Sequence, residues 1–152
     1  MQRSRISESV TKTRSILAFI LCLLTVAHVL AAEIEKGVPE APPDAKAVAG
    51  SYYCGDGLGY NVTLTLKDDG TYFGEWNGCL GKYGEASGAW KVSGKSVVLT
   101  PKREEGNMKG HLRTLDVMKY KGGWIFVRAD DRDFYDKHGV FRFTCFQKRV
   151  EK

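Results

Sequence analysis

Two histidines, a methionine and several carboxylates fall in the longer connections between predicted strands, where such side chains could hold a metal ion. The candidate ligands are His111, His138, Met108 and Asp56. A metal site would pair the histidines with carboxylates, or with the methionine and a reduced cysteine for a soft ion such as copper. No dense spacing such as C-x-x-C or H-x-x-x-H is present. We therefore expect solvated loop groups, with a metal site as the alternative.

Side chains arranged for catalysis are scarce. No serine stands in a G-x-S-x-G motif, and Gly55, Gly57 and Gly59 precede no predicted helix that could cradle a phosphate. Acidic pairs could perform acid–base chemistry at any surface, but the pattern marks none of them as buried. We predict that the protein is not an enzyme, that no residue is catalytic and that no cofactor is required.

Three cysteines lie in the part of the chain expected to fold, namely Cys54, Cys79 and Cys145. In an oxidising compartment one pair should form a disulfide. Cys54 and Cys79 each end a predicted strand at the same end of the fold, whereas Cys145 lies roughly 16 Å along the last strand at ~3.3 Å per residue. A disulfide requires Cα atoms within ~7 Å. We predict a Cys54–Cys79 disulfide with Cys145 buried and unpaired, unless a bent strand brings Cys145 within reach.

From Gly50 onward, short segments that alternate apolar and polar side chains are separated by glycine turns. The alternation is plain at 61–66, where Val62, Leu64 and Leu66 share one face. Eight strands are predicted, at 50–54, 61–66, 71–77, 85–92, 96–100, 115–120, 124–128 and 140–147, with one short helical candidate at 130–137. This spacing predicts an all-β fold, most economically a small antiparallel up-and-down, lipocalin-like barrel, because closure removes exposed edges; an open sandwich is the alternative.

Up-and-down topology places alternate connections at the same end of the barrel. The tight glycine turns fall at one end, and the longer connections fall at the other, at 54–60, 77–84, 101–113 and 129–139. We expect any binding site at the long-loop end. An eight-stranded barrel is either filled by side chains or holds one small ligand. We favour a filled interior; in a hollow one, the ligand-binding residues would be Tyr52, Trp76, Trp90 and Trp124.

The first 47 residues predict two segments that precede the barrel domain, which should span 48–150. Residues 1–32 carry basic residues, an apolar run at 16–30 and the pair Ala31-Ala32, a pattern typical of a secretory signal peptide. The run is shorter than the ~20 residues that a membrane anchor needs. Residues 33–47 hold three of the four prolines and predict an extended linker.

The formal net charge of +5 belongs largely to the predicted signal peptide. Its removal takes away four of the 23 Lys and Arg residues and one of the 18 Asp and Glu residues, which leaves +2. No basic stripe remains to follow a phosphate backbone, so nucleic acid is not an expected partner. We expect a monomer in the periplasm or outside the cell, without a membrane span after cleavage.

Three stretches of the chain resemble a known family: G-S-Y-Y-C-G-D-G-L-G at 50–59, V-T-L-T-L-K-D-D-G-T-Y at 62–72 and Gly88-Ala89-Trp90. They are similar to the N-terminal domain of the NlpE-like copper-resistance lipoproteins. The resemblance implies a small lipocalin-like barrel in the bacterial envelope, where that family senses surface or copper stress. Cys54 and Asp56 match the family's first cysteine and acid, but Gly57 replaces the second cysteine of its C-x-x-C pair and the lipobox is missing. The resemblance therefore implies the fold and the compartment, and not the copper or redox function.

These observations predict an exported, non-enzymatic binding or envelope-associated module. Its partner would be a small ligand or an envelope protein. One alternative is a metal-binding or thiol-redox, stress-sensing protein that uses the long-loop end. Another is an inhibitor of a secreted enzyme.

Overall fold

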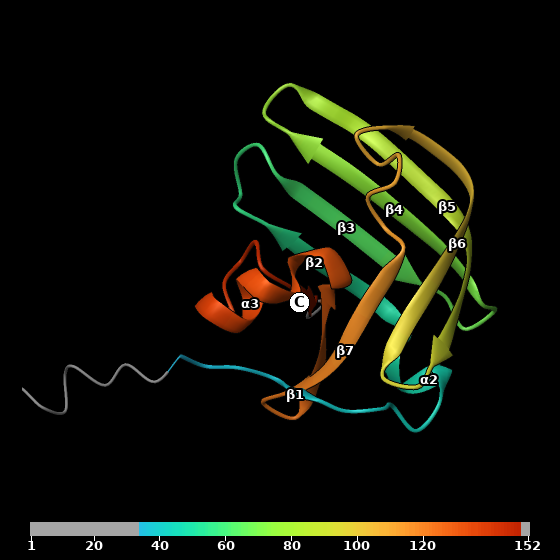
Figure 1. The fold of residues 1–152 in the computed structure, drawn as a ribbon. Helices are drawn as coiled ribbons and strands as arrows, with labels where there is room; N and C mark the ends of the chain where they lie inside the picture. Colours follow the sequence, from blue (N-terminus) through green and yellow to red (C-terminus); the bar gives the residue numbers. More distant parts are fainter. Residues whose placement is uncertain (1–33, 150–152) are drawn as a thin grey trace, which may run out of the picture. The chain divides into compact units, whose positions relative to one another are not determined.

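The computed structural model describes residues 34–149, so the predicted signal peptide lies outside the described residues (Figure 1). No helix within 34–149 is long and apolar enough to cross a membrane. The elements, in chain order, are β1 (Val38–Pro39), α2 (Ala45–Val48), β2 (Gly50–Gly55), β3 (Asn61–Leu66), β4 (Thr71–Gly78), β5 (Gly81–Ser93), β6 (Ser96–Gly106), β7 (Thr114–Tyr120), β8 (Gly123–Arg128), η1 (Ala129–Asp131), α3 (Arg132–His138) and β9 (Phe146–Lys148).

Strands β2 to β9 form a closed antiparallel barrel in which each strand pairs with its neighbours in the chain. The short strand β9 closes it by pairing with β8 on one side and β2 on the other. The extra strand β1 pairs with the end of β7 that extends beyond β6. The predicted eight-stranded up-and-down barrel is confirmed.

Strands such as β3 bury alternate residues as predicted, but β8 buries four in succession, from Trp124 to Val127. Three sets of strand bounds also differ: β5 begins at Gly81 and not at 85, a bulge extends β6, and the last strand is shorter. The prediction that the fifth barrel strand ends at residue 100 was wrong, because β6 continues to Gly106. The ladder jumps from Ser87↔Arg103 to Gly88↔Pro101. Proline has no N–H for a ladder, and a bulge accommodates that interruption. The last strand was predicted at 140–147, but only Phe146–Lys148 pair as a strand.

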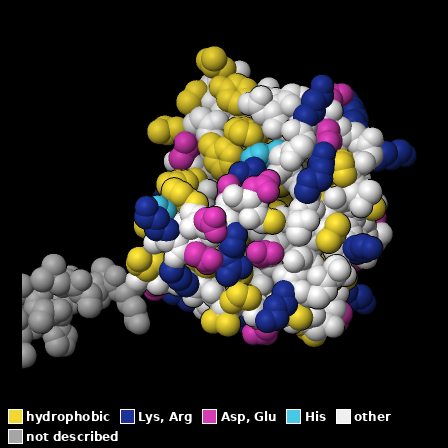
Figure 2. Space-filling view, viewed as in Figure 1, with side chains coloured by type: hydrophobic (Ala, Val, Ile, Leu, Met, Phe, Trp, Pro, Cys, Tyr) yellow, Lys and Arg dark blue, Asp and Glu magenta, His cyan; other side chains and the backbone are white. Residues whose placement is uncertain are grey.

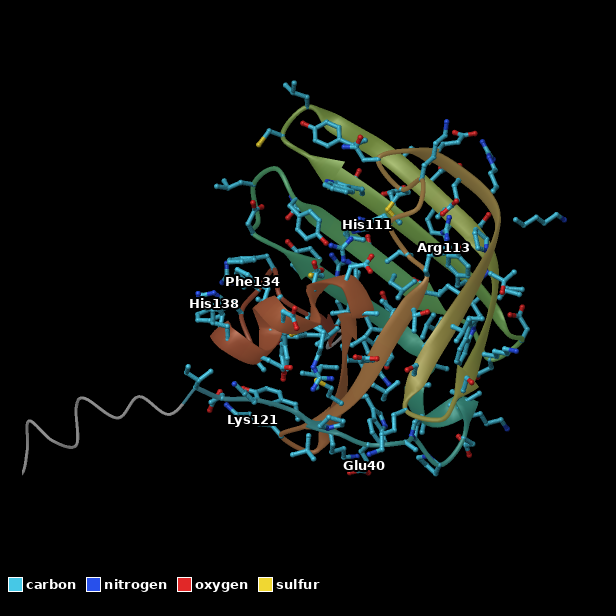
Figure 3. All side chains as sticks on the ribbon, in the orientation of Figure 1. Glu40, His111, Arg113, Lys121, Phe134 and His138 are labelled. Atoms are coloured by element: carbon cyan, nitrogen blue, oxygen red, sulfur yellow. The ribbon has the colours of Figure 1, made fainter. Side chains whose placement is uncertain are left out.

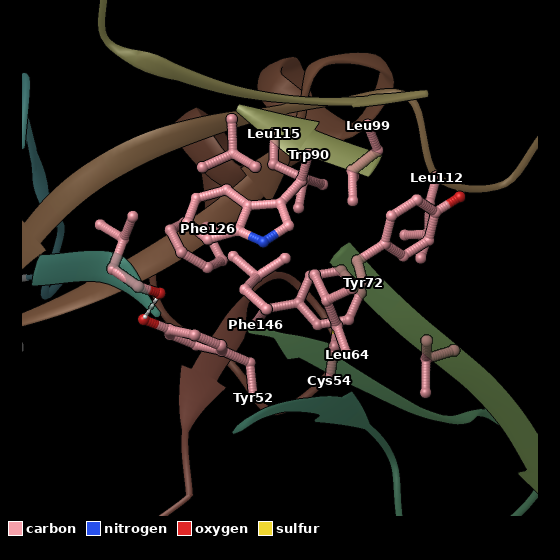
Figure 4. Close-up of a cluster of buried hydrophobic side chains, with 14 of the residues drawn as sticks. Tyr52, Cys54, Leu64, Tyr72, Trp90, Leu99, Leu112, Leu115, Phe126 and Phe146 are labelled. Carbon is pink, nitrogen blue, oxygen red and sulfur yellow. Dashed lines mark hydrogen bonds between the residues drawn. The ribbon is translucent and has the colours of Figure 1, made fainter. Parts of the chain in front are cut away.

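Large aromatic side chains fill the barrel (Figure 4). The rings of Tyr52 and Phe126 lie 4.3 Å apart between centroids. The polar atoms of two core aromatic residues bond to backbone carbonyls. The Tyr52 hydroxyl donates to the Val48 carbonyl at 2.8 Å, and Trp90 Nε1 donates to the Lys67 carbonyl at 2.9 Å. The filled interior that the sequence favoured is the one the structure shows.

The segment predicted as a linker is extended but lies against the barrel. The Gly37 N–H donates to the Tyr135 hydroxyl of α3 at 2.5 Å, and Lys121 pairs with Glu35 at 2.7 Å. The helix α2 follows, and its last residue, Val48, is fully buried in the core. Residues 34–48 are therefore part of the folded unit.

Candidate binding site at the open end of the barrel

Four connections converge at the end of the barrel opposite α2, which we call the open end (Figure 1). Cys79 in the β4–β5 turn places its Sγ 3.4 Å from the Leu58 carbonyl in the β2–β3 loop. The Tyr60 hydroxyl lies 3.2 Å from Nε2 of His111 in the β6–β7 loop. Arg128, where the β8–β9 connection begins, donates from Nη1 to His111 Nδ1 at 2.7 Å. The four connections share one rim as predicted, but the prediction of a long connection at 77–84 was wrong. Strand β4 runs to Gly78 and β5 begins at Gly81, so this connection is a tight turn.

The β6–β7 loop plugs the mouth of the barrel. Its Met108 and Leu112 are fully buried in the core. A Cβ added to Gly74 on β4 would lie 2.9 Å from Met108 Cε and 3.0 Å from Leu112 Cδ1, so the plug packs directly onto the barrel wall. The thioether of Met108, predicted as a metal ligand, is therefore a packing group. The loop leaves His111 at the mouth (Figure 3).

His111 is held in a chain of polar contacts that runs inward from a surface carboxylate. Asp131 accepts two hydrogen bonds from the Arg128 guanidinium, at 2.5 and 2.8 Å. Because a guanidinium only donates, His111 Nδ1 accepts from Arg128, and the neutral ring directs its Nε2–H at Tyr60. Burial, together with the positive charge of Arg128, lowers the pKa of His111 to about 4. The imidazole is therefore neutral near pH 7, with both nitrogens engaged.

Trp76 completes an aromatic group around His111. Its ring centroid lies 4.9 Å from that of His111 and 4.8 Å from that of Tyr60, the latter edge-on. Its Nε1 donates to the Gly59 carbonyl at 3.2 Å. Of the four aromatic residues predicted to bind a ligand in a hollow barrel, Trp76 lies at the open end. The other three lie in the buried core: Tyr52, Trp90 and Trp124.

A pocket of about 500 Å³, the rim pocket, opens beside this group. Its lining residues are Asp56, Tyr60, Arg128, Asp131, Phe134, Phe143 and Thr144. Phe134 and Phe143 give it an apolar part, with their ring centroids 6.0 Å apart, and the two aspartates and Arg128 give it charged groups. Figure 2 shows further hydrophobic side chains over the β2–β3 and β4–β5 loops, where Leu58 and Leu80 are exposed. The open end thus combines apolar and hydrogen-bonding surface.

The predicted metal ligands do not come together. His138 lies on α3 and packs on Phe134, with ring centroids 4.2 Å apart (Figure 3). Asp56 Oδ1 accepts backbone N–H groups of Leu58 and Tyr60 at 2.7 and 3.1 Å, and these bonds lower its pKa. Among residues 34–149, no group of three or more His, Cys, Asp or Glu side chains is arranged to hold a metal ion.

The predicted Cys54–Cys79 disulfide is not formed, and the three cysteines of the described chain are free. Val62 pairs with Cys54 on one side and Trp76 on the other, which separates those two Cα atoms by about two strand spacings, ~10 Å. Cys79 lies three residues further, beyond the ~7 Å that a disulfide spans. Cys54 faces the core, whereas Cys79 is exposed at a turn. Cys145 is buried, as predicted.

The sequence interpretation missed Tyr60 and Arg128, two central residues of the open end. Tyr60 directly precedes β3, and Arg128 ends the apolar run of β8. For Arg128 a signal was available in the sequence. It is a cation at the end of an apolar strand, on the side of the barrel where the long connections were predicted to gather. Tyr60 carried no comparable signal, because a tyrosine beside a strand is common.

The chain matches no family model, no curated protein and no solved structure. The structure supports the coarser part of the NlpE-like resemblance, namely a small eight-stranded antiparallel barrel.

Proposed function

We propose that the protein is an exported, non-enzymatic binding protein that holds a small ligand in the rim pocket. The observation that carries this proposal is the position of the pocket. The barrel interior is occupied by its own side chains, whereas the concave surface at the open end joins an apolar wall to charged groups. Its volume of about 500 Å³ lies within the ~300–1,000 Å³ usual for small-molecule sites.

The charges of the lining favour a neutral or cationic ligand. Asp56 and Asp131 contribute two carboxylates, and the one guanidinium, Arg128, is already paired with Asp131. The backbone hydrogen bonds to Asp56 keep its carboxyl ionised by lowering its pKa. A ligand with a flat apolar group could pack against Phe134 and Phe143. An amine or another donor on the same ligand could bond to the carboxylates.

The contacts of His111 support a binding role over a catalytic one. A general base needs a free nitrogen within reach of the proton that it removes. Both nitrogens of His111 are directed at protein groups, Nδ1 at Arg128 and Nε2 at Tyr60. The low pKa keeps this network in one protonation state near pH 7, which suits a fixed recognition surface.

The test is ligand-observed NMR with a library of small aromatic and alicyclic amines. The protein is purified from an exporting bacterial host, and its N-terminus, expected at Glu33, is read by mass spectrometry. Compounds that bind the wild-type protein should lose their signal with the Phe134→Ala/Phe143→Ala variant. They should keep it with Phe73→Ala, which removes an exposed phenylalanine from β4 instead. An absence of binders, or equal binding to both variants, would contradict the rim pocket as the ligand site.

A further inference from the structure

A second concave surface lies on the outer wall of the barrel, beside β2 and β9, and shares no lining residue with the rim pocket. Its volume is about 330 Å³, and it is lined by Tyr53, Arg142, Gln147, Lys148 and Arg149. Three of these five residues are cations, and none is acidic. We propose that this surface, the basic pocket, binds the phosphate group of a phosphorylated ligand.

The ion pairs of the arginines single out this pocket. Residues 34–149 contain six arginines. Four of them pair with carboxylates, namely Arg103, Arg113, Arg128 and Arg132. Within the described chain the other two, Arg142 and Arg149, have no carboxylate partner, and both line the basic pocket. Their charge therefore remains available to an external anion.

The backbone fixes both arginines to β2. The Arg142 carbonyl accepts the Gly55 N–H at 2.7 Å, and the Arg149 N–H donates to the Ser51 carbonyl at 2.9 Å. The strand pair β2–β9 lies between these attachments, with Tyr53 opposite Gln147. The backbones of both arginines are therefore anchored to the barrel wall, so binding a ligand there does not require the backbone to become ordered.

Tyr53 orients one of the cations without neutralising it. The Arg149 guanidinium carbon lies 5.2 Å from the centroid of the Tyr53 ring, within the range of a cation–π contact. The Tyr53 hydroxyl donates to Asn61 Oδ1 at 2.5 Å, which holds the ring in place. Lys148 Nζ donates to the Ala49 carbonyl at 3.1 Å, which is an uncharged partner.

These features match phosphate better than a single carboxylate. A phosphate monoester carries a charge of about −1.5 to −2 at neutral pH and three acceptor oxygens. Planar guanidinium groups bind such oxygens in pairs, and the nearby ammonium adds a point charge. A carboxylate has only one negative charge to set against three cations. The source of the phosphate is either a soluble phosphorylated compound or a phospholipid headgroup.

Isothermal titration with pyrophosphate, in low-salt buffer free of other phosphate, tests the site. We expect saturable binding that weakens with added salt. The Arg142→Gln/Arg149→Gln variant should bind at least about tenfold more weakly, since each lost arginine removes charge-assisted hydrogen bonds. The control Lys91→Gln/Arg103→Gln removes two charges from the exposed faces of β5 and β6 and should bind like wild type. No saturable binding, or equal weakening in both variants, would overturn the proposal.

Two further measurements complement the titration: one locates the site without any variant, and the other identifies the source of the phosphate. Arginine Nε–Hε signals in NMR spectra of the wild-type protein should shift at Arg142 and Arg149 during the titration and stay constant at Arg113, which remains paired with Glu104. Shifts at all arginines alike would overturn the site without any variant. Flotation with phosphatidylglycerol vesicles then separates the sources: capture that pyrophosphate reverses identifies a lipid headgroup, and pyrophosphate binding without capture identifies a soluble compound.

Discussion

The interior of the barrel and its open end use similar aromatic residues in different ways. In the interior, the polar atoms of Tyr52 and Trp90 bond to backbone carbonyls, and the rings pack against other apolar side chains. At the open end, Tyr60 contacts another side chain, His111, which in turn accepts from Arg128. Backbone partners are fixed by the fold itself, whereas a network of side chains depends on each member.

This difference indicates which part of the molecule maintains the fold and which part is available for recognition. Aromatic rings that are fully removed from water contribute stability through burial. Half-buried rings that stand beside polar groups contribute less to stability and present a mixed surface to a ligand. The three predictions below test this division, in order of the expected effect.

Thiol reactivity should separate the two regions most strongly. Burial, with a smaller contribution from Cys145, raises the pKa of Cys54 to about 12, and burial raises that of Cys145 to about 11. Since only the thiolate reacts, a pKa raised from 9 to about 12 lowers the reactive fraction of Cys54 about a thousandfold. Iodoacetamide at pH 8 should therefore label Cys79 in the native protein, and Cys54 and Cys145 only in denaturant.

Peptide mapping by mass spectrometry reads these labels site by site. Protection of Cys79, lifted by a reducing agent, would mean that the turn cysteine forms a disulfide in solution. Rapid native labelling of Cys54 would mean that the core is open to solvent. Either result would remove the contrast between the interior and the open end.

The loss of stability when a phenylalanine is truncated to alanine should be large in the barrel interior and small at the open end. Phe126 is fully buried against Tyr52, so Phe126→Ala should lower the free energy of unfolding by about 3–5 kcal/mol. Phe134 on α3 is 45% exposed, and Phe134→Ala should change it by less than ~1 kcal/mol. Urea denaturation of both variants measures the difference. Comparable losses would show that the rim pocket is part of the stabilising core.

The architecture was predictable because alternation and glycine turns are local signals. Residues 61–66 alternate along the sequence, and β3 buries the same residues. The extension of β6 was not predictable from Pro101, because a bulge depends on the partner strand. Gly88 permits it: a Cβ there would lie 2.2 Å from the Thr100 carbonyl oxygen. The shortness of β9 likewise depends on long-range pairing with β2 and β8.

The candidate site was predictable in location but not in composition. Topology alone placed His111 at the end with the long connections. It did not show that Met108, three residues away, turns inward and plugs the barrel, since a methionine suits a core as well as a metal site. Nor did it show that Arg128 would occupy the imidazole nitrogen that a metal ion would need. Such pairings arise only when strands distant in sequence end side by side.

The smallest effect that we predict concerns His111 and pH. Its pKa in the folded protein, about 4, lies below its ordinary value of 6.5, because burial and Arg128 disfavour the imidazolium. Between these values the unfolded state binds more protons than the folded state. Stability therefore rises with pH through this window and is lost as the pH falls from about 6.5 to 4. The contribution of His111 should reach about 3 kcal/mol.

Urea denaturation at several pH values between 4 and 7 measures this contribution as a difference between variants. His111→Gln retains an acceptor for Arg128 but does not titrate, so the pH dependence should become shallower. If wild type and His111→Gln lose stability in parallel as the pH falls, folding does not lower the pKa of His111. The contacts of His111 with Arg128 and Tyr60 would then not hold the imidazole in its neutral form beside the rim pocket.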